Sequence, residues 1–412
     1  MRAPIEFERL EDLCELFADG DWIETKDQSP SGLRLIQTGN IGIGEFKDRV
    51  ERARFVSEPT FKRLRCTEIF EGDCLVSRLP DPVGRSCVLP PTGERMITAV
   101  DCTIIRFKRN LVEPKYFHYF AQSDGYFRQV QELTTGATRQ RISRTNLGSI
   151  IIPCPTLPAQ QRIVAILDEA FAGLATASAN AEKNLKNARE LFDNYLGKIF
   201  SKKGPGWVDS AVGDIADHCL GKMLDKRKNR GELKPYLRNL NVRWFDFNLT
   251  DLLEMRFEKD ETDRYSAIKG DLLICEGGYP GRAAIWQREE PIFFQKAIHR
   301  VRFGTPGLNK WFLYYLYLMD AKGELSQHFT GAGIQHFTGQ ALDRFSFPIP
   351  PDAELNEHIL KFDELMAQTL ALQTTYESKL RNIANLRRSI LQRAFSGKLT
   401  SPPSSAIEEA AE

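Results

Sequence analysis

Residues 135–142 read TGATRQRI, and residues 330–337 read TGAGIQHF. Gly136 and Gly331 lie 195 positions apart (331 − 136), and this offset then holds for about 65 residues. It joins Asp168 to Asp363 and continues to Ser396, the counterpart of Ser201. An unbroken offset of this length indicates two copies of one unit. A duplicated unit suits a target that has two parts.

The composition is typical of a globular protein. The 412 residues are enough for two or three domains, and 42% hydrophobic with 27% charged residues is ordinary. We find no run of 18 apolar residues and no apolar signal-peptide core near Met1, so we expect no membrane span. The eight cysteines form no Cys-x-x-Cys pair, which favours reduced thiols in a cytoplasmic protein over a zinc site or a disulfide framework.

The overall charge says little about nucleic-acid binding, because the net charge is only +1. Local charge is more informative. Residues 222–243 contain eight basic and two acidic residues, a local balance of 8 − 2 = +6. This segment is compatible with an anionic partner.

The first half of each copy has short β-like runs separated by Gly and Pro. We expect strands of small α+β domains at 33–37, 69–76, 96–100 and 103–107, and at 237–242, 271–275, 283–286 and 298–303. The offset drifts in this half, from 201 between Asn40 and Asn241 to 196 between Tyr119 and Tyr315. Drifting loops on a fixed scaffold are expected where loops carry specificity.

The second half of each copy is predicted to be a long helix, because residues 159–200 contain no proline. Residues that are apolar except for Ser178 recur at steps of four and three, at positions 167, 171, 174, 178, 181, 185, 188, 192, 195 and 199. The same positions plus 195 form a more polar seam in the second copy. We expect the two helices to pair as an antiparallel coiled coil. The alternative is a long helix packed on its own domain.

The expected fold class is α+β, with two globular domains in a head-to-tail repeat, each followed by a long helix. The predicted boundaries are 1–158 for the first globular domain, 159–206 for the central helix, 207–353 for the second globular domain, 354–400 for the C-terminal helix and 401–412 for a disordered acidic tail.

Motifs for catalysis are not found in the sequence. We find no phosphate-loop motif, no His-Glu-x-x-His pair and no metal-ligand spacing among the six histidines. We also find no amino-methyltransferase or nuclease signature. The glycines between Gly39 and Gly44 are interpreted as a turn, with a phosphate cradle as the alternative. The sequence predicts no catalytic residue and no metal site.

A family resemblance rests on the segments that open and close each helix. Residues 153–164 read PCPTLPAQQRIV and are followed by Leu167-Asp168, which closely resembles the Pro-x-Pro-Pro-Leu-x-Glu-Gln-x-Arg-Ile run of specificity subunits of type I restriction-modification systems. The second copy, PIPPDAEL at 348–355, is similar but degenerate. The FSGKL sequence at 395–399 and the repeated Thr-Gly-Ala also fit that family. The resemblance covers essentially residues 5–400.

The resemblance implies two target recognition domains joined by an antiparallel helical spacer. It implies that the chain binds a bipartite, asymmetric double-stranded DNA target in host defence and neither cuts nor methylates it. Two methyltransferase subunits and two restriction subunits are the implied partners. S-adenosylmethionine, ATP and Mg²⁺ would belong to those partners, so no cofactor is expected in this chain.

The residues that we predict to contact DNA are polar or basic and lie at corresponding places in the two copies. They are Arg34, Thr38, Asn40, Arg78, Arg85, Arg139, Gln140, Arg141 and Arg144 in the first copy, and Arg238, Asn239, Asn241, Arg243, Arg282, Gln295, Lys296, Gln335 and His336 in the second. Such side chains read base edges or hold phosphates. Helix capping or a solvated face is the alternative for each. The aromatic runs at 116–120 and 311–315 favour buried helices over base stacking.

Two other classes of function remain open from the sequence. One is a self-contained DNA methyltransferase or nuclease. The other is a coiled-coil scaffold that binds only protein. Methyl transfer by the purified chain alone would favour the first, and failure of the partner complex to bind DNA in a salt-dependent way would favour the second.

Overall fold

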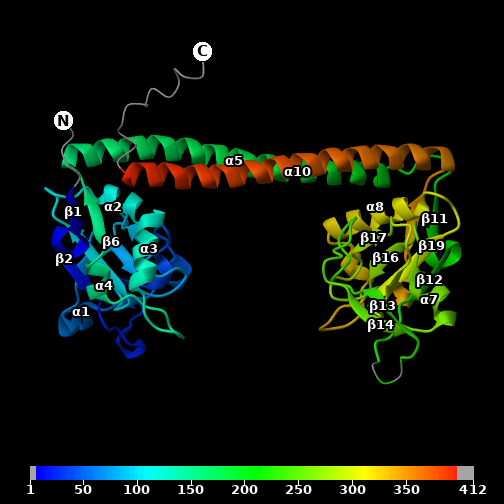
Figure 1. The fold of residues 1–412 in the computed structure, drawn as a ribbon, viewed down its shortest axis with the longest axis horizontal. Coiled ribbons are helices and arrows are strands. Elements are labelled where there is room, and N and C mark those ends of the chain that lie inside the picture. The colour runs from blue at the N-terminus through cyan, green and yellow to red at the C-terminus, as the bar shows by residue number, and fades with distance from the viewer. Residues whose placement is uncertain (1–5, 226, 228, 397–412) are drawn as a thin grey trace, which may run out of the picture. The chain divides into compact units, whose positions relative to one another are not determined.

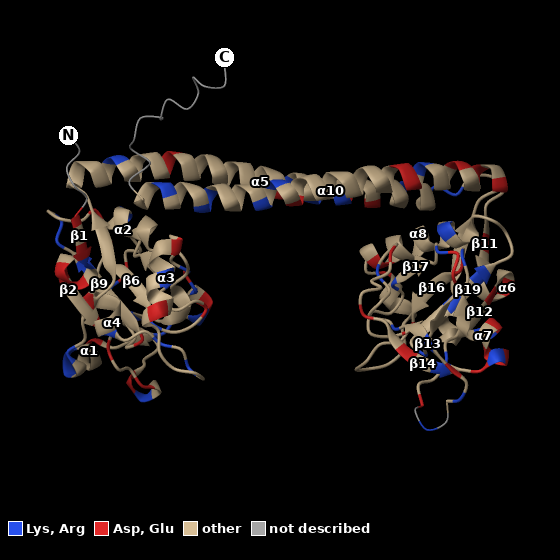
Figure 2. Cartoon of the chain, viewed as in Figure 1, with Lys and Arg blue, Asp and Glu red and all other residues tan. Residues whose placement is uncertain are grey.

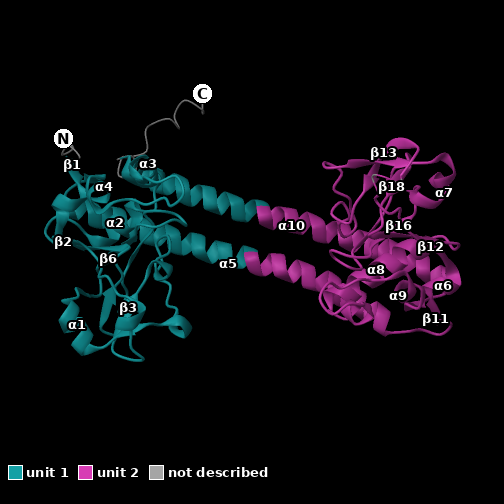
Figure 3. Ribbon diagram, turned by 90° about the horizontal axis from the view of Figure 1, so that it is seen from below, with its two compact units in different colours: residues 1–181, 378–412 teal, residues 182–377 magenta. Residues whose placement is uncertain are grey.

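The structure is a computed structural model that describes residues 6–225, 227 and 229–396. The chain divides into two compact units (Figure 3). Unit 1 consists of residues 1–181 and 378–412, and unit 2 of residues 182–377. Each unit therefore contains one globular part and one half of each long helix. The predicted tail at 401–412 lies outside the described residues.

Unit 1 begins with ten short strands and five helices (Figure 1). The strands are β1 (Glu6–Arg9), β2 (Cys14–Asp19), β3 (Leu33–Ile36), β4 (Phe55–Val56), β5 (Glu68–Ile69), β6 (Cys74–Ser77), β7 (Ser86–Val88), β8 (Met96–Thr98), β9 (Cys102–Phe107) and β10 (Ile151–Cys154). The helices are α1 (Glu58–Leu64), α2 (Pro114–Phe120), α3 (Asp124–Leu133), α4 (Arg144–Gly148) and α5 (Leu157–Ser201), with 3₁₀ turns η1 (Leu10–Leu13), η2 (Thr25–Asp27), η3 (Thr38–Asn40) and η4 (Val50–Arg52).

Unit 2 repeats the order of the ten strands. Its strands are β11 (Val208–Ala211), β12 (Ala216–Leu220), β13 (Glu232–Leu237), β14 (Leu253–Phe257), β15 (Ser266–Ala267), β16 (Leu272–Cys275), β17 (Ala283–Ile285), β18 (Ile292–Phe294), β19 (Ile298–Phe303) and β20 (Ser346–Ile349). Its helices are α6 (Val212–Ile215), α7 (Thr262–Tyr265), α8 (Leu308–Ala321), α9 (Gly339–Asp343) and α10 (Asp352–Phe395), with 3₁₀ turns η5 (Lys259–Glu261) and η6 (Leu325–His328).

The sheets of the two units have the same topology. In unit 1 the orders are β2-β9-β6-β7, β4-β3-β8-β5 and β1-β10, and in unit 2 they are β12-β19-β16-β17, β14-β13-β18-β15 and β11-β20. Among the described strands, every pairing is antiparallel except β3 with β8 and its counterpart β13 with β18; the isolated bridges Asp21–Ala99 and Lys222–Gln295 are also parallel. The repeat read from the sequence is therefore a repeat of structure, and the predicted α+β class is confirmed.

Some strand boundaries differ from the sequence prediction. The single strand expected at 69–76 is two strands, because Gly72 adopts φ +83° in a turn between β5 and β6. The strand expected at 237–242 ends at Leu237, residues 239–241 form a turn, and Val242 forms an isolated bridge with Phe247. The polar run Glu71-Gly72-Asp73 marks the turn in the first segment, whereas Leu240 and Val242 continue the apolar pattern past the end of β13. The two aromatic runs form the buried helices α2 and α8, as predicted.

The heptad seam of the long helices is confirmed by burial. All ten predicted positions of α5 are buried or half-buried, and in α10 only Arg387 is exposed. In unit 2 the helices run antiparallel, because Tyr195 packs on Phe362 at 6.1 Å while the earlier Arg189 meets the later Glu377 at 3.9 Å. Among the described residues, α5 alone is long and apolar enough to pass the length and composition test for a membrane span.

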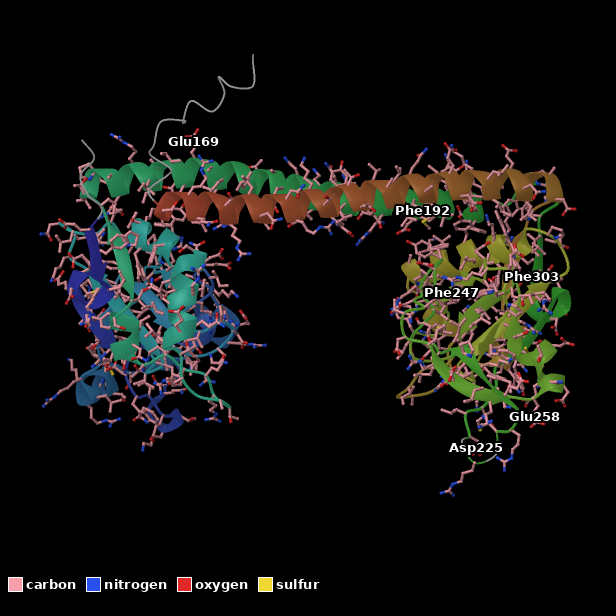
Figure 4. The ribbon with its side chains drawn as sticks, in the orientation of Figure 1. Glu169, Phe192, Asp225, Phe247, Glu258 and Phe303 are labelled. Atoms are coloured by element: carbon pink, nitrogen blue, oxygen red, sulfur yellow. The ribbon has the colours of Figure 1, made fainter. Side chains whose placement is uncertain are left out.

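Each long helix also belongs to the core of its globular part. In unit 1, Leu167 and Phe171 of α5 pack in one hydrophobic cluster with Tyr116 of α2 and with Leu391 and Ala394 of α10. In unit 2 the corresponding cluster contains Phe192, whose ring lies 6.1 Å from that of Tyr314. Figure 4 shows Phe192 facing the globular part of unit 2, whereas Glu169 points away from the globular part of unit 1.

One aspartate in each unit fixes the long helix to the helix below it. Asp168 accepts hydrogen bonds from Tyr119 Oη at 2.5 Å and from Lys115 Nζ at 3.0 Å. Asp363 accepts from Tyr314 Oη at 2.7 Å and from Lys310 Nζ at 2.5 Å. The offset is 195 for all three residues, so the counterpart of Tyr119 is Tyr314, and the expected match with Tyr315 at an offset of 196 is wrong. We call this three-residue arrangement the aspartate clamp.

The clamp affects the ionisation of its members. Burial alone would raise the pKa of Asp168, but the hydrogen bonds from Tyr119 and Lys115 hold it below the ordinary value. Burial and the Asp168 carboxylate raise the pKa of Tyr119, so its hydroxyl stays a donor. A charged acceptor in this position gives a stronger hydrogen bond than a neutral one.

Replacement of Asp363 by Ala should lower the free energy of unfolding of unit 2 by roughly 1–3 kcal/mol, because it leaves the buried Tyr314 hydroxyl without its acceptor. Urea titration followed by tryptophan fluorescence measures this, since Trp207, Trp244, Trp286 and Trp311 all lie in unit 2. Lys361→Gln removes an exposed ion pair of the same helix and should change stability by less than about 0.5 kcal/mol. Equal midpoints for the two variants would contradict the clamp.

Candidate nucleic-acid interface

The repeated Thr-Gly-Ala stretch forms the same hairpin in both units. Thr135 and Arg141 exchange backbone N–H···O hydrogen bonds of 3.0 and 2.9 Å, and Thr330 and His336 exchange bonds of 2.9 and 2.8 Å. Gly136 and its counterpart Gly331 adopt φ of +99° and +109°. A Cβ at these positions would lie 2.3 and 2.2 Å from a carbonyl oxygen across the turn, so only glycine fits.

Each hairpin is fixed at its base and free at its tip. Ile142 and Phe337, which follow the hairpins, are fully buried, and their amides donate to the carbonyls of Arg78 at 3.2 Å and Glu276 at 2.7 Å. Ser143 and Thr338 then cap the short helices α4 and α9. The tip residues stay exposed: Arg139 and Gln140 in unit 1, and Ile334 and Gln335 in unit 2.

A second loop is built by a buried asparagine in each unit. Asn40 accepts from the Gln37 amide at 3.0 Å and donates to the Lys47 carbonyl at 3.0 Å. Asn241 makes the matching bonds, from the Arg238 amide at 2.8 Å and to the Asn248 carbonyl at 2.9 Å. The glycine-rich stretch at 39–44 is therefore a turn, as predicted, and the asparagine side chain closes it.

A buried arginine then ties this loop to the next one. Arg85 donates to the carbonyls of Thr38 at 2.9 Å and Ile41 at 2.8 Å, and also to those of Leu79, Pro80 and Pro82. Its counterpart Arg282 donates to the Asn239 carbonyl at 3.0 Å. The Arg85 guanidinium is thus occupied in holding loops together, whereas the Nε of Arg282 has no partner among the described residues.

In unit 1 the hairpin and both loops meet around a cavity of about 870 Å³. Its lining comes from all three segments and from α3: Ile43, Pro80, Asp81, Pro82, Val83, Phe127, Val130, Gln131, Thr134, Gly136 and Gln140. In unit 2 the same three segments meet where Asn239 Nδ2 donates to the Gly277 carbonyl at 3.0 Å. A Cβ on Gly277 would lie 3.0 Å from the His336 ring.

The structure sorts the predicted DNA-contacting residues by exposure. Those that are buried are Arg34, Asn40, Arg78, Arg85 and Asn241. Those that are half-buried are Thr38, Arg238, Asn239, Arg282, Gln295 and His336. Those that are exposed are Arg139, Gln140, Arg141, Arg144, Arg243, Lys296 and Gln335. DNA contact stays a prediction for all of them.

The buried arginines have structural partners. Arg34, 4% exposed, pairs with Asp48 and with Glu94, the latter at 2.8 Å. Arg78 donates to the Val100 carbonyl at 2.6 Å and lies 3.2 Å from Asp19. For these side chains to contact bases, their hydrogen bonds and ion pairs would have to break. That costs more free energy than the use of a side chain that has no partner. Their geometry supports a role in shaping the loops.

The exposed residues differ in how free their side chains are. Arg141 pairs with Asp101 at 2.8 Å, and Arg243 donates to the Leu240 carbonyl at 2.6 Å. No ion pair or side-chain hydrogen bond holds Arg139 or Arg144 within the described part of the chain. Lys and Arg are spread over both units and both long helices (Figure 2), so charge alone does not locate an interface.

Metal-ligating and thiol side chains were searched over the residues that the structure describes. Among residues 6–225, 227 and 229–396, no group of three His, Cys, Asp or Glu side chains could hold a metal ion. All eight cysteines are free thiols, and burial raises the pKa of Cys14, Cys87 and Cys102 to about 12, which makes them poor nucleophiles.

The hairpin of unit 2 rests on a buried histidine, which should make it sensitive to acid. His299 Nε2 lies 2.9 Å from the Phe337 carbonyl oxygen, and burial lowers the pKa of His299 to about 4 from the ordinary 6.5. The unfolded chain therefore binds the proton more readily, and stability is lost as the pH falls from about 6.5 toward 4.

Hydrogen exchange at pH 7 and pH 5, corrected for intrinsic rates, should show lower protection of residues 330–337 at the lower pH. Residues 135–142 are the internal control, because Thr103 stands where His299 stands in unit 2 and bonds to Asp19 at 3.1 Å. His299→Gln should remove the difference between the two pH values. An equal response of both hairpins would refute this role of His299.

Comparison with known proteins agrees with the repeat. The family model described as "Type I restriction modification DNA specificity domain" matches residues 4–186 and 205–382. The specificity subunit of the type I restriction enzyme StySPI from Salmonella potsdam is 24% identical over 308 residues, 70% of this chain and 66% of that one. The EcoKI subunit from Escherichia coli K12 is 23% identical over 318 residues, 73% and 68%. The chain thus matches about two-thirds of the length of these relatives.

Solved structures agree on the fold. A chain from a study of complex assembly and conformational transition of the type I R-M system superposes with a TM-score of 0.79 at 18% identity, over 97% of this chain and 100% of that chain. The HsdS subunit from Thermoanaerobacter tengcongensis gives 0.60 at 20% identity, over 97% and 98%. With two matched domains that cover most of its length, the chain belongs to the family of type I restriction-modification DNA specificity proteins.

Proposed function

We propose that this chain is the DNA-reading subunit of a type I restriction-modification complex and that each unit reads one half of a two-part, asymmetric target. The observation that carries the proposal is the hairpin that both units build on the same backbone bonds. Family membership makes DNA the ligand to be read. A reading element that occurs twice supports a target with two halves.

The hairpin tips support the asymmetry of the target. Both tips carry a glutamine, Gln140 or Gln335, whose amide can bond in a bidentate way to adenine in the major groove. The residue before it is Arg139 in unit 1 and Ile334 in unit 2. An arginine there can pair with guanine, whereas isoleucine offers apolar contact to a thymine methyl group. The two units would therefore prefer different bases.

The aspartate clamps support the assembly with partners. Because α5 and α10 are fixed to their globular parts by the same contacts, each unit would offer an equivalent frame for one methyltransferase subunit. Restriction subunits would join that complex. In this proposal S-adenosylmethionine, ATP and Mg²⁺ bind to the partner subunits. The chain itself is not an enzyme, and the complex works in the cytoplasm.

Mapping of DNA methylation by the chain together with its methyltransferase partner tests the proposal. Arg139→Ala and Gln140→Ala should relax base preference in one half of the target by roughly 1–3 kcal/mol, about 5- to 150-fold. Gln335→Ala is the matched control and should relax only the other half. Methyl transfer by the purified chain without a partner would contradict the non-catalytic role, and methylation without sequence preference would contradict DNA reading.

The spacing between the two half-sites should depend on the helices, because α5 and α10 each continue without a break from one unit into the other. Insertion of seven residues into both helices, next to Ala181 and next to Ser378, keeps the heptad seam and adds about 10 Å to each helix. The unspecified spacer should then lengthen by about 3 base pairs at ~3.4 Å each. The control is a variant in which residues at the same two places are replaced by residues of the same composition, without a change in the length of either helix. An unchanged spacer would contradict this dependence.

A further inference from the structure

Unit 1 contains a second cavity, of about 520 Å³, beside the turn that Asn40 closes. Its lining is rich in arginine: Gln37, Thr38, Gly39, Asn40, Arg49, Arg52, Ala53 and Arg54. No acidic side chain lines it. These arginines are not among the residues predicted to contact DNA, although residues 49–54 read RVERAR.

The three arginines stand on a well-fixed backbone. In η4 the amide of Arg52 donates to the carbonyl of Arg49 at 3.0 Å, so the two residues are three positions apart on one 3₁₀ turn and share a face. The Arg54 carbonyl accepts from the Leu35 amide at 2.8 Å, which ties it to β3. Because the backbone of these three residues is already held in one conformation, it loses little conformational entropy when a ligand binds.

The guanidinium groups of these residues are free within the described part of the chain. Arg49, Arg52 and Arg54 are exposed and form no ion pair or side-chain hydrogen bond there. The neighbouring Asp48 pairs instead with the buried Arg34. Three like charges around one cavity repel one another, and an anion bound between them would relieve that repulsion.

We propose that Arg49, Arg52 and Arg54 bind backbone phosphates of the DNA half that unit 1 reads. This inference rests on the proposed function. Guanidinium groups suit phosphate because each can donate two parallel hydrogen bonds to its oxygens. The cavity wall includes Thr38, whose carbonyl accepts from Arg85, and Arg85 also holds the loop at 79–82 beside the hairpin. A phosphate held here would fix the register of DNA against the reading hairpin.

Unit 2 does not repeat this cluster. Its corresponding loop follows Asn248, the counterpart of Lys47, and reads Leu249, Thr250, Asp251 and Leu252 without an arginine. Asp251 there pairs with Arg238 at 2.6 Å. The phosphate site is thus a property of unit 1 alone, and the two halves of the target would be held with unequal electrostatic strength.

The triple variant Arg49→Gln, Arg52→Gln, Arg54→Gln tests the inference in the complex with the methyltransferase partner. Dissociation constants for a duplex with the mapped target and for an unrelated duplex are measured from about 50 to 200 mM salt. We expect both affinities to fall by a similar factor, while base preference at both halves stays as in the unaltered complex. The slope of log K against log salt should become shallower by about 2–3, close to 0.9 per phosphate contact.

A charge-matched control is Lys62→Gln, Arg109→Gln, Arg128→Gln, which removes three exposed basic residues of unit 1 outside the cavity. It should leave the slope within about 1 of the unaltered complex. The same slope change in both variants, or no change in the first, would overturn the phosphate site while the proposed function stands. Failure of the unaltered complex to prefer its target would instead overturn the proposed function. Circular dichroism and co-purification with the partner confirm that each variant folds.

Discussion

The carboxylate of one aspartate on each long helix organises the rest of the fold. Asp168 and Asp363 each hold a tyrosine hydroxyl and a lysine ammonium from the helix packed against them. The same helices donate from Tyr116 and Trp311 to the carbonyls of Pro153 and Pro348, in the strands that lead into the long helices. Strand, short helix and long helix are thus joined by equivalent hydrogen bonds in both units.

The sequence predicted the frame of the molecule well because the frame is periodic. The heptad seam and the fixed offset of 195 both recur many times, so single departures such as the exposed Arg387 do not hide them. The end of β13 at Leu237 was missed because Leu240 and Val242 continue the apolar pattern, and the turn at Gly72 was missed although Glu71, Gly72 and Asp73 interrupt that pattern. A turn of this kind depends on φ at one residue, and no periodic signal reports it.

The predicted interface was chosen by residue type, and type does not reveal what a side chain already holds. Arg85 and Arg139 look alike in the sequence, yet Arg85 is bonded to five carbonyls inside the loops and Arg139 stands exposed at a hairpin tip. Arg34 is neutralised by two carboxylates that lie 14 and 60 positions away in the chain. Arg49, Arg52 and Arg54 were passed over for the opposite reason, since nothing local distinguishes a free cluster from a solvated face.

The division of the chain also has a consequence for its synthesis. Unit 1 is built from both ends of the sequence, and its core includes Leu391 and Ala394 from the last turns of α10. A ribosome adding about 5–20 residues per second releases those residues roughly 10–40 seconds after it has made the first part of unit 1. During that interval the ring faces of Tyr116 and Phe120 that will pack on Phe395 remain uncovered. Unit 2, which is continuous in sequence, has all its residues available first, so the nascent chain can complete its second globular unit before its first.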